Sequence, residues 1–419
     1  MKKKIIGIVM SPLLVALLLT MVAISSSVQA VGMGQTAQTN FCGDSDQNCL
    51  GFQSGKQMTQ EQMRERIMEM CQIGLQRRLF GPVEYDNGTV TGFFIAFNFD
   101  ESTGTITNYS VREGDEMLRV FENIEISDFT SENVKVIGSI FVASDETHRV
   151  IAHNNPTALL HIMAKGPAEI SITIPEDFEI QQVSSNNTCL DVVYRITKDN
   201  FVGAIGVSNG TASLVENGEG TYLNVSGNDT HLFFRMRPYF HGTGLGMQSQ
   251  LMNAVVGGRI CAEIRVMVHN GDTIYDAQVY DHRYTFRIVS AAQNRVTVQV
   301  ASEQHEGRLF LFMLDNDTIS VSNQLRVKLD GSDVAKANDM DEILNATGTS
   351  TSDARYYGFE IDGLQYVLVY VPHFSEHTIE ISSLATSAGI PVTWIAVAVI
   401  GIGAVVTAAA VLAKGGRKQ

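Results

Sequence analysis

Tryptophan, proline and cysteine are scarce in this 419-residue sequence, with one, eight and five copies, and several familiar enzyme motifs are missing. The sequence has no glycine-rich phosphate loop and no HExxH, GxSxG or EF-hand pattern. No two cysteines form a CxxC pair, which is the usual spacing in structural zinc sites. The sequence therefore gives no support for a P-loop nucleotide-binding protein, a zinc protease, an α/β-hydrolase or a calcium sensor. We predict no metal and no cofactor.

Basic residues are also few, because 30 Lys and Arg stand against 45 Asp and Glu, for a formal net charge of −15. Six of the basic residues lie in the first 30 and the last six positions, so the chain between them is more acidic still. A nucleic-acid-binding surface needs the opposite sign, and we predict no nucleic-acid partner. A strongly acidic surface suits an extracellular protein in salt, where self-repulsion is screened.

No repeat of 20–50 residues is visible, which argues against a solenoid or a propeller. The histidines are scattered as well, and no group of them has the spacing of a metal site. We therefore predict that each occupies a strand or a turn. The ten are His148, His153, His161, His231, His241, His269, His282, His305, His373 and His377.

The N-terminus has the three parts of a secretory signal peptide. Three lysines follow the first methionine, residues 5–24 are apolar, and serines and small residues lead up to Ala30. We predict a signal peptide over residues 1–30, cleaved after Ala30. An uncleaved N-terminal anchor is the alternative, and Pro12 and the serines argue against it. No cysteine lies next to the cleavage position, so a lipoprotein is not expected.

The C-terminus contains an uncharged apolar stretch, residues 390–413, with Trp394 near its start. A helix of this length spans a hydrocarbon core of about 30 Å. Three basic residues in the tail 414–419 place that tail in the cytoplasm by the positive-inside rule. The alternative, a buried core helix, does not fit the charge-free length. Only the short linker 383–389 precedes the span, so the last domain is expected to lie close to the membrane.

Eight Asn-x-Ser/Thr sequons occur, and none lies in the signal peptide or the span. Chance predicts roughly three in this composition, so we predict N-glycosylation of an exported chain. The eight are Asn87, Asn108, Asn186, Asn209, Asn224, Asn228, Asn316 and Asn345.

All five cysteines lie in the predicted ectodomain, where exported thiols usually pair. Cys42 and Cys49 could close a small loop, or one of them could reach Cys71. Cys189 and Cys261 could link two strands. One cysteine is left over, as a buried thiol or an intermolecular bridge.

Residues 31–57 are rich in Gly, Gln, Ser and Asn and are expected to form a flexible lead-in. One amphipathic helix follows, beginning at a capping box of Thr59 and Gln62 and ending at Gly81-Pro82. Its apolar stripe is expected to pack in the core and not to bind a ligand. The stripe consists of Met63, Ile67, Met70 or Cys71, and Leu75.

From residue 90 onward, apolar and polar residues alternate in short runs separated by Gly, Asn and Asp turns. This pattern predicts a mainly β protein built of β-sandwich-like modules. We expect one or two modules over residues 58–290 and a membrane-proximal β domain over residues 291–382. Residues 242–258 are expected to form a core helix with glycine hinges, with a membrane-touching loop as the alternative. Residues 332–353 are expected to be a loop or a short helix.

Three stretches resemble segments of uncharacterised archaeal cell-surface proteins. They are His153-Asn154-Asn155-Pro156-Thr157-Ala158-Leu159-Leu160-His161, Val371-Pro372-His373-Phe374-Ser375-Glu376-His377-Thr378-Ile379, and the hairpin over residues 91–106. The resemblance implies an exported, β-rich ectodomain with a C-terminal span. The resemblance implies no particular activity for this chain.

The tripeptide His373-Phe374-Ser375 also resembles the cleavage site of ZU5-type and GAIN-like autoproteolytic domains. That resemblance implies attack of the Ser375 hydroxyl on the preceding carbonyl, with His373 as base. Such chemistry needs a strained turn and donors for the oxyanion. The alternative is that both side chains cap a turn between two strands.

Topology and sequons together favour a non-enzymatic surface glycoprotein with a structural, adhesive or envelope-assembly role. Its expected partners are the membrane, through one C-terminal helix, and other envelope proteins or further copies of itself. An anchored ligand-binding or hydrolytic module is the alternative, because a site built from strand loops leaves no linear motif. A self-cleaving membrane-proximal domain is the third hypothesis.

Overall fold

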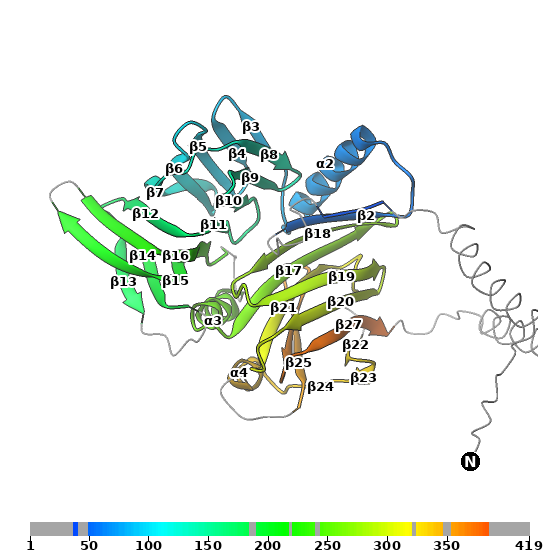
Figure 1. Ribbon diagram of the computed structural model, residues 1–419. Helices are drawn as coiled ribbons and strands as arrows, with labels where there is room; N and C mark the ends of the chain where they lie inside the picture. Colours follow the sequence, from blue (N-terminus) through cyan, green and yellow to red (C-terminus); the bar gives the residue numbers. More distant parts are fainter. Residues whose placement is uncertain are drawn as a thin grey trace, which may run out of the picture.

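The computed structural model describes residues 37–40, 49–183, 190–217, 220–238, 244–320, 324–346 and 353–384. It is mainly β, which confirms the predicted class, and its strands form three sheets (Figure 1). The predicted signal peptide, transmembrane span and tail lie outside these residues, as do Cys42, Cys189 and Asn186. Within the described ranges, no helix combines the length and apolarity needed to cross a membrane.

The first unit is a 14-stranded antiparallel sheet, here called the large sheet. Its main path runs β3-β4-β5-β6-β7-β12-β16-β11-β10-β9-β8, with β13, β14 and β15 attached through β16. The strands are β3 (Val83–Asp86), β4 (Thr89–Gly92), β5 (Ile95–Asp100), β6 (Thr105–Glu113), β7 (Glu116–Ile126), β8 (Asn133–Ile137), β9 (Ile140–Ser144), β10 (His148–His153), β11 (Leu160–Ala164), β12 (Pro167–Ile174), β13 (Glu179–Val183), β14 (Val192–Lys198), β15 (Phe201–Asn217) and β16 (Gly220–Met236).

The large sheet curls until its two ends meet around an aromatic core. The Val83 amide on β3 donates to the Gly138 carbonyl in the β8–β9 turn at 2.9 Å, which joins the first strand to the last. The alternation along β5 turns Ile95, Phe97 and Phe99 inward, as the sequence predicted. Phe97 and Phe99 both pack edge-on against Phe141 of β9, at centroid separations of 5.3 Å.

The second unit consists of an eight-stranded central sheet and a five-stranded small sheet. The two pack face to face around a shared apolar core. In order across the sheet, the central strands are β1 (Ala37–Asn40), β2 (Cys49–Ser54), β18 (Asp272–Val279), β17 (Ile260–His269), β21 (Arg308–Asp315), β26 (Leu364–Val371), β25 (Arg355–Ile361) and β24 (Ala335–Lys336). The small-sheet strands are β19 (Tyr284–Ala292), β20 (Arg295–Ser302), β27 (Glu376–Leu384), β22 (Gln324–Leu329) and β23 (Ser332–Asp333).

Strands β18, β21 and β26 are buried along their whole length, because both faces of the central sheet are covered. One face meets the small sheet. The other face packs against helices and against residues of the large sheet, in a core that both units share. Leu159 and Phe233 of the first unit and Met267 and Leu311 of the second unit belong to this shared core.

The predicted flexible lead-in is wrong for residues 49–54, which form β2 inside the central sheet. Leu50 and Phe52 of this strand are fully buried. Gly51 has to be glycine, because a Cβ atom there would lie 1.9 Å from Cζ of the Tyr275 ring on β18. The segment was expected to be flexible partly because it is rich in glycine, but Gly51 is needed to make room for the Tyr275 ring.

The predicted domain division at residues 290 and 291 does not separate two units, because β19 and β20 pair across it as a hairpin. The chain leaves the large sheet after β16 and enters the second unit at helix α3 (Gly244–Val256). The strand β27 runs to residue 384 and therefore includes the start of the predicted linker.

Helix α2 (Gln60–Gln76) begins at the predicted capping box: the Thr59 side chain accepts from the Gln62 amide and the Gln62 side chain accepts from the Thr59 amide. It ends at Gln76, earlier than predicted. Its stripe packs in the shared core, with Ile67, Met70 and Cys71 buried. Helix α3 is a core helix, as expected for residues 242–258, and α4 (Met340–Asn345) is a short helix within residues 332–353.

Candidate functional site

A layer of buried polar side chains joins the two units, and it is called the interface network below. Its members are His153, Asn155, Thr157 and Arg235 from the first unit, and Glu263, Arg265, Asp276, Gln278 and Tyr280 from the second unit. None is more than 5% exposed. Because burying a charge or an unpaired polar group is costly, groups in this position must satisfy one another.

Strand alternation explains why four of these side chains share one face. On the neighbouring strands β17 and β18, Glu263 lies opposite Gln278 and Arg265 lies opposite Asp276. The residues between them in sequence, such as Ile264 on β17, turn to the other face and join the core against the small sheet. Each strand is therefore apolar toward the small sheet and polar toward the large sheet.

Glu263 lies between two buried arginines. Arg235 Nε and Nη2 donate to Glu263 Oε1 at 2.8 and 2.5 Å, and Arg265 Nη2 donates to Glu263 Oε2 at 3.2 Å. Arg235 Nε also donates to the Tyr280 hydroxyl at 3.0 Å. Burial alone would lower the pKa of Arg235, but the Glu263 carboxylate and Tyr280 outweigh it and raise that pKa. Arg235 is thus held as a cation, and its ion pair with Glu263 bridges the two units.

A second bridge pairs His153 with Asp276. The His153 Nδ1 atom lies 2.7 Å from Asp276 Oδ1, and Asn155 Nδ2 donates to Asp276 Oδ2 at 2.8 Å. Burial would raise the pKa of Asp276, but His153, Arg265 and Asn155 together lower it. Asp276 is thus held as a carboxylate inside the protein.

The His153–Asp276 pair resembles the base and orienting acid of a catalytic triad, but its surroundings differ. Both side chains have no exposed surface, and His153 Nε2 has no hydrogen-bond partner in the structure. The nearby Cys71 thiol is fully buried, and burial first and Asp276 second raise its pKa far above the ordinary range of a thiol. A protonated thiol and a sealed histidine leave no route for a substrate, so the geometry favours a structural bridge.

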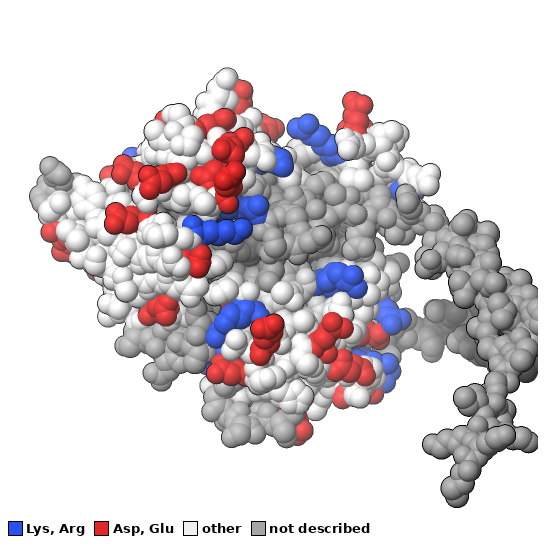
Figure 2. All heavy atoms as spheres, in the orientation of Figure 1, with Lys and Arg blue, Asp and Glu red and all other residues white. Residues whose placement is uncertain are grey.

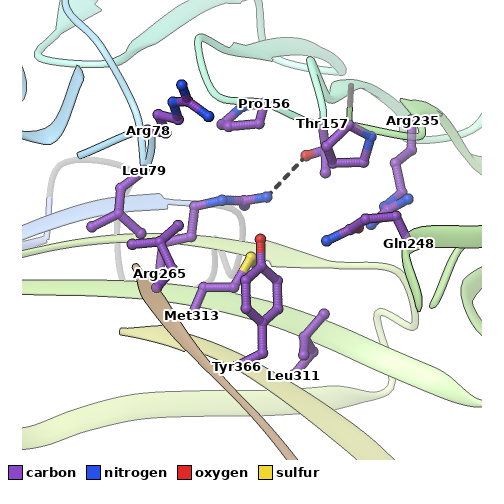
Figure 3. Close-up of a pocket in the computed structure, with 12 residues that line it drawn as sticks. Arg78, Leu79, Pro156, Thr157, Arg235, Gln248, Arg265, Leu311, Met313 and Tyr366 are labelled. Atoms are coloured by element: carbon purple, nitrogen blue, oxygen red, sulfur yellow. Dashed lines mark hydrogen bonds between the residues drawn. The ribbon is translucent and has the colours of Figure 1, made fainter. Parts of the chain in front are cut away.

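The network also encloses a small cavity (Figure 3). Gln248 of α3, Arg265 of β17 and Tyr366 of β26 point into it from three sides, and Arg265 Nη2 donates to Thr157 Oγ1 at 3.2 Å. Arg265 Nη1 and Gln248 Nε2 are buried and have no hydrogen-bond partner among the described residues. The cavity volume is about 10 Å³, which has room for one water molecule that could accept from both donors. This space fits a structural water and not a substrate.

Three histidine rings lie in a row beside the network. His231 of β16 stacks on His282, which follows β18, with centroids 4.5 Å apart and planes 3° apart. His161 of β11 lies 5.8 Å from His231. Burial, and then the neighbouring histidines, lower the pKa of His161. Burial, and then His282, lower the pKa of His231 to about 4. Burial also lowers the pKa of His282. The rings are neutral at neutral pH, and no metal-binding group of three or more His, Cys, Asp or Glu occurs in the part of the chain that the structure describes.

The described sequon asparagines are all exposed. They are Asn87, Asn108, Asn209, Asn224, Asn228, Asn316 and Asn345. Asn224 and Asn228 are both exposed on β16.

Cys71 is a free thiol buried in the shared core, which is one of the states that the sequence left open. It faces inward from α2, toward Gly138 of the first unit. Cys261 is also buried, and its Sγ donates to the Leu309 carbonyl at 3.4 Å. The other candidate pairings involve side chains outside the described residues.

The tripeptide with the autoproteolytic resemblance forms the turn between β26 and β27. His373 and Ser375 are exposed, whereas Phe374 is buried against Tyr284 at a centroid distance of 4.7 Å. The Phe374 carbonyl lies 3.2 Å from His305 Nδ1. None of the three residues has a positive φ angle. This geometry suits a turn held in place by an apolar anchor.

An open groove of about 800 Å³ lies over strands β3 to β7 of the large sheet. Threonine and asparagine side chains line much of its floor, and Asp100, Glu101 and the half-buried Tyr85 form part of its wall. Tyr85 donates to Glu101 Oε1 at 2.6 Å. Sequence reasoning identified only one groove residue, Asn87, as a site residue.

The sequence was compared with family models, curated proteins and solved structures. No family model matches the sequence, and no curated protein matches it. One solved structure with limited similarity is an active YidC insertase, at 12% identity and a TM-score of 0.22, covering 47% of this chain and 52% of that one. Another is a glycoside hydrolase of family 81 from Clostridium thermocellum, at 7% identity and a TM-score of 0.26, covering 75% of this chain and 37% of that one. The match spans about half of the first protein and 37% of the second, and similarity this low supports no conclusion about function.

Proposed function

We propose that this chain is an exported, N-glycosylated surface protein, anchored by its C-terminal helix, with a structural, adhesive or envelope-assembly role. The observation that carries the proposal is the exposure of every described sequon asparagine, on both units of the fold. An oligosaccharyl group can reach such positions without unfolding the chain. The signal-peptide and anchor patterns at the two ends of the sequence support the same topology.

The interface network supports a structural role over catalysis. Its histidine, carboxylates and arginines are the groups that could do acid–base chemistry, and they are sealed between the units. They bridge two β units into one body, which suits a protein that must hold its shape outside the cell.

The surface charge is consistent with this proposal. On the face drawn in Figure 2, acidic side chains are spread over both units with basic ones interspersed. Interspersed charges with a net negative sign favour solubility in salt and give no basic footprint for nucleic acid.

A ligand-binding module is the second candidate, because the open groove on the large sheet has the volume of a typical small-molecule site. Self-cleavage before Ser375 rests on the tripeptide alone.

Mass spectrometry of the full chain, isolated from membranes of its own host, tests the proposal. We expect a mature N-terminus at Val31, retention in the membrane after an alkaline carbonate wash, and glycans on peptides that carry the exposed sequons. External protease should digest the ectodomain of intact cells. A chain that washes off the membrane, or that carries no glycan at any sequon, would contradict the proposal.

A further inference from the structure

The groove on the large sheet carries a row of neutral hydrogen-bonding side chains. Strand register places Thr89 of β4 opposite Asn98 of β5, Asn98 opposite Thr107 of β6, and Thr107 opposite Asn123 of β7. All four line the groove. The row crosses four neighbouring strands on one face, so it presents hydroxyl and amide groups at the spacing of adjacent strands, about 4.8 Å.

The hydrogen-bonding groups of the row are only partly satisfied, by one another and by Glu125. Thr89 Oγ1 lies 3.3 Å from Asn98 Oδ1, and Asn123 Nδ2 donates to Glu125 Oε1 at 2.6 Å. Asn123 Oδ1 is buried and has no hydrogen-bond partner in the structure. A buried acceptor without a donor is costly, so this atom calls for a donor from a ligand or from water.

The chemistry of the groove fits a saccharide. Threonine hydroxyls and asparagine amides both donate and accept, as sugar hydroxyls do. The Tyr85 ring adds an aromatic surface at the wall, where it also packs on Phe141 at 5.5 Å. No lysine or arginine lines the groove, which argues against a phosphate or a carboxylate as ligand.

One saccharide is expected at the rim of this groove. Asn87 lines the groove and is the acceptor of the sequon Asn87-Gly88-Thr89, which begins at the tip of the β3–β4 hairpin. Asn87 and Gly88 have φ angles of +46° and +78°, as in the tight two-residue turns that Asn-Gly favours. This rigid turn holds the glycan attachment point at a fixed place next to the row. In Figure 1 the hairpin lies at the end of the large sheet away from the small sheet.

We propose that the groove binds the first sugars of the N-glycan attached to Asn87 of the same chain. The proposal rests on the N-glycosylation inferred above. A tethered sugar is presented at an effective concentration on the order of millimolar, so a weak site suffices to hold it. The docked glycan covers the outer face of β4 to β7.

Site-resolved mild periodate oxidation of the native full chain tests this docking, because the reagent cleaves accessible vicinal diols. We expect the proximal sugars at Asn87 to oxidise at least about tenfold more slowly than those at Asn209, which corresponds to about 1.4 kcal/mol of docking free energy. Asn209 is the matched control, since it is an exposed sequon on the same sheet but away from the groove. After unfolding, the two sites should oxidise at the same rate.

The double variant Asn98→Ala/Thr107→Ala keeps the sequon and removes the middle of the row. We expect it to retain the Asn87 glycan and to lose its protection from periodate, with the rate at Asn209 unchanged. Equal oxidation of both sites in the native wild-type chain would overturn the docking proposal and leave the proposed surface glycoprotein intact. A chain glycosylated elsewhere but not at Asn87 would also overturn it. A chain without any glycan would instead contradict the proposed function itself.

Discussion

Replacing Glu263 by glutamine is expected to lower the free energy of unfolding by about 3–5 kcal/mol, the usual effect of removing one partner of a buried ion pair. Glutamine keeps the size of the side chain but leaves Arg235 and Arg265 buried with no carboxylate between them. Each arginine is 1% exposed, so water cannot compensate the lost charge. The loss is measured by denaturant unfolding of the detergent-solubilised full chain, monitored by far-UV circular dichroism.

The control for this variant is Asp333→Asn, which removes the carboxylate of an exposed ion pair. Arg326 and Asp333 have side chains that are 42% and 60% exposed, and such pairs contribute roughly 0–1 kcal/mol. A triple variant that replaces Arg235, Glu263 and Arg265 by Met, Leu and Met should recover part of the stability, since these three positions then carry no buried charge. The recovery is incomplete because the buried Asp276 carboxylate loses the nearby Arg265. A loss for Glu263→Gln no larger than that for Asp333→Asn would rule out the ionic bridge as a main link between the units.

Acidification is expected to destabilise the protein between about pH 6.5 and pH 4, through the stacked histidines. His231 has a pKa of about 4 in the folded chain, below the value of 6.5 for the unfolded chain. The unfolded state therefore binds more protons in this window, so the stability present above pH 6.5 is lost as the pH falls. His231 alone accounts for about 3 kcal/mol at pH 4, at about 1.36 kcal/mol per pKa unit.

The charged neighbours of the stack make this prediction specific. Asp229 raises the pKa of His231, but burial and then His282 outweigh it. Asp281 raises the pKa of His282, but burial, together with Arg283, outweighs it. The variant His231→Gln should have a flatter pH dependence of stability over this window. The variant His373→Gln replaces an exposed histidine in a distant turn and should keep the wild-type slope. If His231→Gln and wild type lose stability equally on acidification, the stack is not the cause.

Local features of the fold were predictable from the sequence because they depend on neighbouring residues. The capping box at Thr59 and Gln62 predicted the start of α2, and the alternation of apolar and polar residues predicted the strand that forms β5. Long-range pairing was not predictable in the same way. Strand β2 pairs with β18 more than 200 residues later, and nothing in the composition of residues 49–54 specifies that partner.

The alternation of residues in the sequence contains an indication of the interface network. Glu263 and Arg265 interrupt an otherwise apolar strand at every second position, as Asp276 does in the strand beside it. A strand with charges on one face normally turns that face to water. Here it meets the large sheet, and only the three-dimensional arrangement shows that Arg235 and His153 supply the opposite partners.

The stretch over residues 153–161 stood out in the sequence by resemblance alone, and the structure gives it a physical role. His153, Asn155 and Thr157 each bond across to the second unit. His161, at its end, begins the histidine stack. Together with Arg235 of β16, this segment joins the first unit to the central sheet through polar groups.

The most direct test of the claim that the two β units form one body is calorimetry of the detergent-solubilised full chain. We predict a single unfolding transition whose calorimetric enthalpy equals its van't Hoff enthalpy, because the shared core and the interface network couple the units. The same scan of Glu263→Gln should show the transition at lower temperature. Two separate transitions in the wild-type chain, one for each unit, would contradict the claim.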